Sequence, residues 1–409
     1  MWASTGHEVT VVTGFPSHPT GIVPAEYKGK WIQEEITGGI RIIRTKKFNT
    51  PNRGIFLRLL NHFSMAVSTF IVTVFDRSYY DAVICSSPPL FIGLSALLLK
   101  FIKRTPFVFE ARDLWPQQAI DLGIIKSKIA IYFSRALENS LYRNAEHIVV
   151  VAKGSVDELS RRGIDPEKIS LVRNGVLLHN FDEPPDIRHE LSFREKFIIS
   201  YIGTFGASQG LMTLLTAAKS LKERGREDIH FLLVGDGVER ESLSEFQNHA
   251  GLTNVTIMSA QPFERVPAIY KASDILVVSL RKVPLFARTI PSKLYEAMAA
   301  SVPVLGLVEG ECGTIIQEAG CGFIVEPENS IALANEIERI SAIPKGQLAS
   351  LGKCGRRWVE KNAERSLLAR DYLEILKGCV LARPAPNSKN TSHANDLRIS
   401  DTGASHIEK

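Results

Sequence analysis

The chain has 409 residues, 44% of them hydrophobic and 23% charged, a globular composition that excludes collagen, a long coiled coil and wholesale disorder. This length predicts two or three domains. The five cysteines are scattered and include no C-x-x-C pair, which argues against a disulfide framework and a zinc module. The reducing cytoplasm is the simplest compartment for such a chain.

The net charge is +5, and the excess of basic residues lies in residues 1–180. No basic run with interleaved aromatic residues is typical of a nucleic-acid surface, so we expect no nucleic-acid partner. Phosphate ligands or an anionic membrane are better candidates.

Short β-branched runs alternate with helical patterns along the chain. Most are continuous apolar runs, which are typical of parallel strands buried on both faces. The predicted strands are Val9–Thr13, Ile40–Arg44, Ala82–Cys85, Phe107–Glu110, His147–Val151, Ser170–Val172, Phe197–Ile202, His230–Val234, Val255–Met258, Ile275–Val278, Val302–Leu305 and Gly322–Val325.

This alternation predicts an α/β protein with two Rossmann-like, doubly wound domains in tandem, over residues 1–182 and 190–379. The Pro-rich and acidic segment Asn180–Asp186 is the predicted linker. Residues 380–409 contain few large apolar residues, so we expect a disordered tail.

The chain begins as if inside its first domain. Residues Gly6–Thr10 resemble the end of a helix that enters a second strand. Either a first strand precedes residue 1 in a longer sequence, or the sheet of the first domain has fewer strands than a complete Rossmann-like sheet. The sequence shows no signal peptide, and its most apolar stretch, Leu90–Ile102, is shorter than the roughly 20 residues of a membrane span.

Two glycine-rich turns follow buried strands of the second half. The first, Gly203–Leu211, precedes the helical pattern Leu211–Leu221, so its amides would meet a phosphate at a helix N-terminus, although a plain turn is the alternative. The second begins at Gly235 and has Arg240 where a dinucleotide fingerprint has glycine. It predicts a tight turn that either lines a cleft or has no ligand.

The segment Arg288–Ala300 predicts a helix with Ser292 as its N-cap. Lys293 would lie near the positive start of this helix, and Glu296 one turn onward could bind ribose hydroxyls. A solvated helix face is the alternative.

Polar residues also end two strands of the first half. Glu110, Arg112 and Asp113 stand where open α/β sheets bind ligands, and one of these acids could orient an attacking hydroxyl, unless Asp113 only caps the next helix. The pair Asn174-Gly175 lies near the domain boundary, with an ordinary turn as its alternative.

Several motifs are absent from the sequence. It contains no D-x-D, H-E-x-x-H or P-loop motif, so we expect neither a dedicated metal site nor an ordinary P-loop NTPase. A G-x-S-x-G string spans Gly206–Gly210, but Ser208 lies six residues beyond the strand end, too far for a nucleophile elbow.

Together, four motifs resemble glycosyltransferase family 4, and in particular the bacterial amino-deoxysugar transferases of O-antigen and capsule assembly. The resemblance runs in order to about Cys379. The motifs are Gly203-Thr204-x-Gly206-x-x-Gln209-Gly210-Leu211, Gly235-Asp236-Gly237, Pro291–Ala299 and Asp113-Leu114-Trp115-Pro116.

The resemblance implies a GT-B fold and metal-free, retaining transfer of a sugar from a nucleotide-diphosphate sugar, with UDP as the expected nucleotide. The implied acceptor is a lipid-linked saccharide at the inner face of the cytoplasmic membrane. The basic first half and the stretches Phe56–Phe75 and Leu90–Arg104 could contact that membrane, although core helices are the alternative.

The resemblance also implies roles for individual residues. The catalytic candidates are Glu110, Arg112, Asp113 and Lys293. The donor-binding candidates are Gly203, Thr204, Gln209, Gly210, Gly235, Asp236, Gly237, Gln261, Pro262, Phe263, Arg288, Ser292, Lys293, Leu294 and Glu296. The acceptor-side candidates are His18 and Asn174, and no metal ligand is expected.

Two departures from the family pattern affect the site. Arg288 replaces the first of two glutamates, which usually faces the donor sugar, and Gln209 replaces a common basic residue, leaving Lys293 as the phosphate-binding cation. Two alternatives stay open at this point: an inactive GT-B remnant that only binds or assembles, and an NAD-dependent oxidoreductase.

Overall fold

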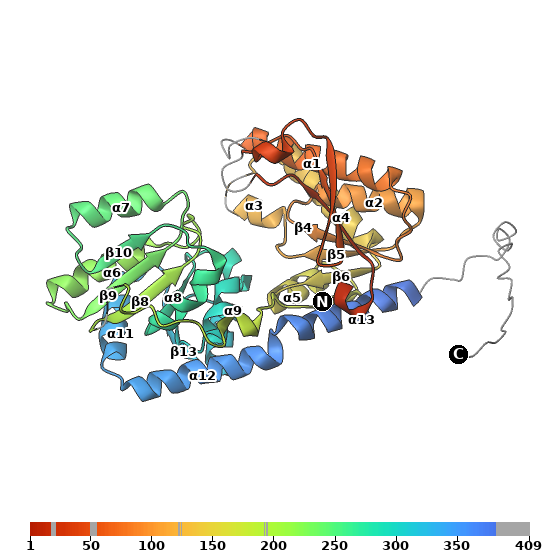
Figure 1. The fold of residues 1–409 in the computed structure, drawn as a ribbon. Coiled ribbons are helices and arrows are strands. Elements are labelled where there is room, and N and C mark those ends of the chain that lie inside the picture. The colour runs from red at the N-terminus through yellow and green to blue at the C-terminus, as the bar shows by residue number, and fades with distance from the viewer. Residues whose placement is uncertain are drawn as a thin grey trace, which may run out of the picture.

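The computed structural model describes residues 1–17, 22–49, 55–121, 123, 125–191, 193 and 195–381. They form two α/β lobes, with the last two helices running beneath both (Figure 1). His18 and the predicted tail beyond residue 381 lie outside the described residues. No helix in the described ranges is both long and apolar enough to cross a membrane.

The first domain contains seven strands and five α-helices. The strands are β1 (Val9–Gly14), β2 (Ile32–Thr37), β3 (Ile40–Thr45), β4 (Val83–Ser87), β5 (Phe107–Ala111), β6 (His147–Val150) and β7 (Ile169–Leu171). The helices are α1 (Ile55–Phe75), α2 (Ile92–Lys103), α3 (Gln117–Asp121), α4 (Lys128–Asn144) and α5 (Lys153–Arg161).

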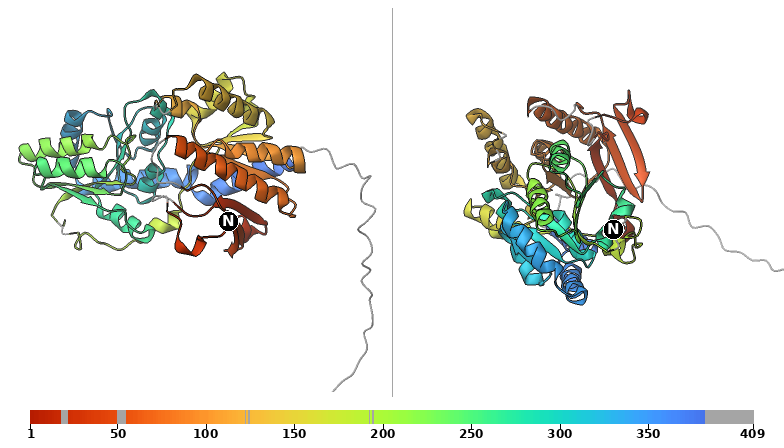
Figure 2. Two further views of the ribbon diagram at one scale, coloured as in Figure 1. Left: turned by 90° about the horizontal axis from the view of Figure 1, so that it is seen from above. Right: turned by 90° about the vertical axis from the view of Figure 1, so that its left-hand side faces the viewer.

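These strands form two sheets, of order β1-β3-β2 and β4-β5-β6-β7. Within the described residues β1 and β4 do not pair with each other. The sequence analysis missed β2, which pairs antiparallel with β3. Its polar sequence, IQEEIT, lacks the apolar run of a buried strand because β2 is an edge strand with one partner. Figure 2 shows the domain from two further directions.

The second domain contains the six predicted strands in one parallel sheet, and the structure gives their order as β10-β9-β8-β11-β12-β13. Its strands are β8 (Phe197–Ile202), β9 (Ile229–Val234), β10 (Val255–Met258), β11 (Ile275–Ser279), β12 (Val304–Leu307) and β13 (Gly322–Val325). Its helices are α6 (Met212–Glu223), α7 (Arg240–His249), α8 (Val266–Ala272), α9 (Ser292–Ala299), α10 (Glu311–Ala319) and α11 (Ser330–Ser341).

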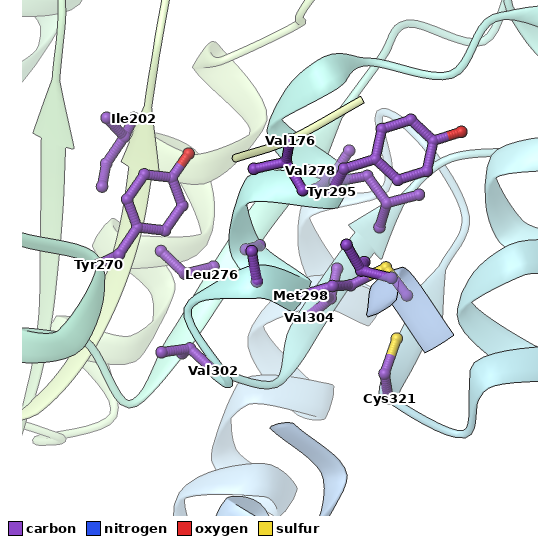
Figure 3. Packing of buried hydrophobic residues seen from close by; sticks show 14 of the residues in the cluster. Val176, Ile202, Tyr270, Leu276, Val278, Tyr295, Met298, Val302, Val304 and Cys321 are labelled. Carbon is purple, nitrogen blue, oxygen red and sulfur yellow. The ribbon is translucent and has the colours of Figure 1, made fainter. Parts of the chain in front are cut away.

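Two apolar cores cover the two faces of this sheet. One includes side chains of α6, α7 and α11, and the other includes side chains of α8, α9 and α10. Figure 3 shows part of the second core, where Tyr270, Tyr295 and Met298 pack over strand residues such as Leu276 and Val304. This packing fixes the start of α9 beside the loop that follows β8.

The chain crosses between the domains twice. Helix α12 (Lys345–Asn362) packs on the second domain, and α13 (Arg365–Leu381) then returns to the first. At the crossing the amide of Val176 donates to the carbonyl of Ala363, at 2.9 Å. On α13, Tyr372 packs over Val108 and Val149 and so covers the second face of the β4–β7 sheet. The sequence analysis had placed this segment in the second domain.

Candidate active site

The candidate donor site lies at the carboxyl end of β8, which is a central strand of the second sheet. Ligands of open α/β sheets bind at this edge. The loop Gly203–Gly210 leaves β8 and leads to α6, so it lies at the positive end of a twelve-residue helix. The amides of Thr204 and Gly206 donate to no acceptor among the described residues, which leaves them available to a phosphate.

Lys293 lies beneath this loop. Its ammonium is 3.8 Å from the centroid of the Tyr201 ring and contacts the Tyr201 hydroxyl, which donates to the carbonyl of Thr204 at 2.8 Å. A Cβ at Gly203 would stand 2.8 Å from the Lys293 Nζ. The structure therefore brings the predicted cation and the predicted phosphate loop together.

Burial lowers the pKa of Lys293 to about 7, and the charge of Glu296 opposes this shift only in part. The Lys293 ammonium therefore loses its proton at a much lower pH than an exposed lysine does. An anionic ligand beside Nζ would favour the charged form, which couples ligand binding to proton uptake.

The second glycine turn supports the first by backbone packing. A Cβ at Gly235 would stand 1.8 Å from the carbonyl oxygen of Gly203, and one at Gly237 would stand 2.3 Å from that of Phe205. The amide of Phe205 donates to the carbonyl of Asp236 at 2.8 Å. These contacts favour the interpretation of a plain supporting turn for Gly235 and Gly237.

Helix α9 places Glu296 one turn beyond Lys293. A carboxylate oxygen of Glu296 accepts a hydrogen bond of 2.9 Å from the buried hydroxyl of Tyr270, which fixes the orientation of the side chain. Ser292 begins the helix but makes no capping bond, so its prediction as the N-cap is wrong; Pro291 occupies that position. The Leu294 side chain is fully buried in the core.

Two further side chains meet the phosphate loop. The side-chain oxygen of Gln209 folds back over the loop and accepts from the Ser208 hydroxyl at 3.1 Å. Arg281, which the sequence analysis missed, packs within 3.2 Å of the position that a Cβ of Gly210 would occupy and pairs with Glu328. The available signal was its place just after β11, the strand beside β8.

The segment predicted to flank the base follows β10 at the same edge of the sheet. Pro262 and Phe263 are exposed, and the Gln261 amide donates to the carbonyl of Ser259 at 3.0 Å. These residues lie beyond the carboxyl end of β10, at the edge of the sheet where the nucleoside contact is predicted.

Arg288 points to the other domain. It forms an ion pair of 3.0 Å with Glu158 on α5 and packs against Gly154. Next to it, the carboxylate of Glu311 accepts hydrogen bonds from the amides of Lys153 and Gly154, at 2.8 and 2.9 Å, and so caps α5 from the second domain. The sequence analysis missed this contact because it joins residues 157 positions apart.

The acceptor-side candidates follow strands of the first domain. Burial raises the pKa of the Asp113 carboxyl group. Its carboxylate accepts a hydrogen bond of 3.3 Å from the side-chain amide of Gln118. The structure thus shows a side-chain contact for Asp113 and not the helix-capping bond that was its alternative role. Arg112 is exposed beyond the end of β5, and Glu110 lies within that strand. Asn174 lies beside the domain crossing, where Arg365 donates to the carbonyl of Gly175.

Within the described ranges no three His, Cys, Asp or Glu side chains lie close enough to hold a metal ion. In the second domain the structure brings together the glycine-rich loop Gly203–Gly210, the buried ammonium of Lys293 and the carboxylate of Glu296 that Tyr270 anchors.

Comparison with known proteins agrees with this arrangement. Residues 1–175 match a family described as the glycosyl transferase 4-like domain, and residues 182–358 match glycosyl transferases group 1. The chain therefore belongs to the glycosyltransferases of the GT4 type. The two matches meet near the predicted linker.

Relatives and solved structures show the same fold. A colanic acid biosynthesis glycosyl transferase of Escherichia coli (strain K12), WcaI, is 25% identical over 389 residues, covering 92% of this chain and 93% of the relative. Sucrose-phosphate synthase from Thermosynechococcus elongatus superimposes with a TM-score of 0.73 at 21% identity, over 93% of this chain and 91% of the other. Anabaena HepE in complex with UDP-glucose gives 0.67 at 15%, over 91% and 100%. The GT-B fold is thereby confirmed.

Proposed function

We propose that this glycosyltransferase moves a sugar from a UDP-linked donor to a lipid-linked saccharide in the synthesis of a cell-envelope polysaccharide, with retention of anomeric configuration. The observation that carries the donor assignment is the Lys293 ammonium, held over the Tyr201 ring beneath the Gly203–Gly210 loop. The colanic acid relative and the UDP-glucose complex of a structural neighbour support the substrate classes.

In this proposal the second domain binds the nucleotide. The free amides of Thr204 and Gly206, the start of α6 and Lys293 stabilise the diphosphate, and Glu296 binds the ribose hydroxyls. Charge-assisted hydrogen bonds of this kind contribute about 1.5–3 kcal/mol each. Because these groups supply positive potential themselves, we propose that transfer needs no dedicated metal ion.

The transfer step breaks the bond between the anomeric carbon and the phosphate oxygen and forms one to the acceptor hydroxyl oxygen on the same face. The hydroxyl proton passes to an oxygen of the departing diphosphate. Lys293 stabilises the negative charge that develops there. Asp113 and Arg112 in the first domain orient the acceptor.

Calorimetric titration of UDP, GDP and NAD in EDTA tests the donor assignment. We expect UDP to bind and NAD not to bind. A folded chain that binds none of the three would contradict the proposal, and binding of GDP alone would correct the nucleotide. Transfer from the bound donor to a lipid-linked saccharide, followed by NMR of the anomeric proton, tests retention.

A further inference from the structure

The first domain has an apolar groove between the β2–β3 hairpin and α1. It encloses about 1290 Å³. Its wall on α1 is a stripe in which every fourth residue is apolar and open: Phe63, Val67, Ile71 and Phe75, exposed by 48, 40, 48 and 78%. A surface helix normally turns polar side chains outward, so an outward apolar stripe indicates a ligand or partner.

The hairpin supplies the opposite wall, with Trp31, Ile32 and Ile43. The strand register sets the direction of the groove, because Ile32 pairs with Thr45 at one end of the hairpin and Thr37 pairs with Ile40 at the other. Thr45 also pairs with Gly14, where the parallel strand β1 ends. One end of the groove therefore opens where the parallel strands β1 and β3 end, the kind of edge at which open α/β sheets bind ligands.

Positive charge is concentrated at that end. Lys46 and Lys47 directly follow β3, and the Lys46 ammonium lies 4.2 Å from the centroid of the Trp31 ring. The Lys47 chain lies against Gly14, since a Cβ there would stand 2.7 Å from its Cδ. Burial lowers the pKa of Lys47, and no carboxylate in the described part of the chain pairs with it.

The acids that line the groove are already neutralised. Glu34 and Asp76 both pair with Arg41, at 3.0 and 2.9 Å. The four basic residues of the lining, Arg41, Lys46, Lys47 and Arg77, outnumber its two acidic residues, so the lining has a net positive charge, and Lys46 and Lys47 lie at the end where β1 and β3 end. In addition, the buried side-chain oxygen of Asn49 has no hydrogen-bond partner in the described structure, so a polar head group could supply one.

We propose that this groove binds a single long-chain lipid phosphate, the carrier of the acceptor, with its hydrocarbon chain along α1 and its phosphate at Lys47 and Lys46. This inference rests on the proposed function for the identity of the acceptor. A lipid phosphate matches both the apolar lining of the groove and the two adjacent lysines at one end, whereas at the other end Arg41 and Arg77 are balanced in number by Glu34 and Asp76. In this orientation the phosphate and its saccharide lie where β1 and β3 end, and the end of the hydrocarbon chain lies near Phe75.

The test is titration of farnesyl phosphate below its micelle concentration, with farnesol and inorganic phosphate as the chain-only and head-only probes. We expect farnesyl phosphate to bind at least about tenfold more tightly than either. Lys47→Met should remove the preference over farnesol. Ile71→Glu should weaken the binding of both chain-bearing probes about tenfold or more, because a charge then lies in the path of the chain.

Matched controls are Lys28→Met, an exposed lysine outside the groove lining, and Ile36→Glu, an apolar side chain that is 79% exposed and also outside it. Both should bind farnesyl phosphate like the parent chain. Wild-type binding by Lys47→Met and Ile71→Glu would overturn the proposal. The proposal would also be overturned if the chain adsorbs to anionic vesicles but does not bind monomeric farnesyl phosphate. A dimer of this chain that dissociates in the Ile71→Glu variant would overturn it too, because the groove would then be a dimer interface.

Titration of UDP on the same variants separates this inference from the proposed function. All four variants should bind UDP like the parent, since none lies in the donor domain. If the parent chain does not bind UDP, the proposed function is contradicted. Farnesyl phosphate binding would still show whether the groove takes a lipid phosphate.

Discussion

The Lys293 ammonium lies 3.8 Å from the centre of the Tyr201 ring, directly below the turn that begins at Gly203. The two residues are 92 positions apart, yet together they place a cation beside the loop proposed to bind phosphate. Gln209, within that loop, is neutral and its side chain folds back over it. In the proposed function Lys293 provides the charge that a basic residue at position 209 would otherwise supply.

Replacing Lys293 with methionine should weaken UDP and pyrophosphate binding by about 10- to 100-fold, because a charge-assisted contact to the diphosphate is lost. Calorimetry measures both ligands. Lys219→Met, on the exposed surface of α6, is the control and should bind normally. Unchanged binding of pyrophosphate by Lys293→Met would remove this residue from the phosphate site.

The affinity for UDP should depend on pH through the same group. Since the pKa of free Lys293 is about 7 and a bound diphosphate raises it, binding takes up a proton above neutrality. The dissociation constant should increase by up to about tenfold per pH unit above pH 7, and calorimetry in buffers of different ionisation enthalpy should show the proton uptake. Lys293→Met should lose this dependence; if the slope persists in that variant, another group is responsible.

Lys293 should also affect the pH dependence of folding. Its pKa is lowered on folding, from 10.5 to about 7, so the unfolded chain binds more protons between these values. The free energy of unfolding should therefore gain a contribution from Lys293 as pH rises from 7 toward 10.5. Urea titrations at several pH values, compared with Lys293→Met, measure this contribution. An equal pH slope in both chains would contradict it.

Glu296→Gln should weaken UDP binding about tenfold and pyrophosphate binding by less, because the ribose contact is lost for UDP alone, while removal of the Glu296 charge lowers the pKa of Lys293 for both ligands. Tyr270→Phe should give a smaller effect in the same direction, since it removes the 2.9 Å bond that orients the carboxylate. Glu245→Gln, on the exposed surface of α7, is the matched control. Equal losses for UDP and pyrophosphate would place Glu296 at the phosphate instead.

Gly235→Ala and Gly237→Ala should each destabilise the second domain by at least about 2 kcal/mol, because the new methyl group meets a backbone carbonyl and both residues have a positive φ. Thermal unfolding measures the loss. Gly346→Ala is the control. A Cβ at this position of helix α12 would have no neighbouring atom within 4 Å, so the substitution should be neutral or slightly stabilising. A normal melting temperature for Gly235→Ala would show that the two loops can separate.

The contacts between the two domains at α5 predict how substitutions change the radius of gyration of the chain. Glu311→Ala removes two hydrogen bonds to the helix N-terminus, whereas Arg288→Ala removes one partly exposed ion pair. We therefore expect Glu311→Ala to increase the radius of gyration more than Arg288→Ala does, as measured by small-angle scattering. Neither change lies in the phosphate loop, so UDP should still bind. A compact Glu311→Ala chain would show that the crossing helices alone hold the cleft.

The sequence by itself determined the class of fold and the strands of the second sheet. Continuous apolar runs such as Ile229–Val234 identify buried parallel strands, and the carboxyl ends of such strands lie at the same edge of a sheet. The resemblance to glycosyltransferase family 4 predicted that Gly203 and Lys293 belong to one site, and the structure places the two residues side by side. Apolar runs did not predict β2, whose polar edge sequence carries no such signal.

Only the tertiary structure decided what each side chain contacts. Arg288 and Glu311 meet α5 across the domain boundary, Leu294 turns into the core, and α13 returns to cover the first domain. The apolar stripe of α1 is equally typical of a core helix in sequence, and its exposure becomes evident only once the hairpin packs beside it without covering it. Such contacts join residues far apart in the chain, and their energies depend on packing that no local pattern encodes.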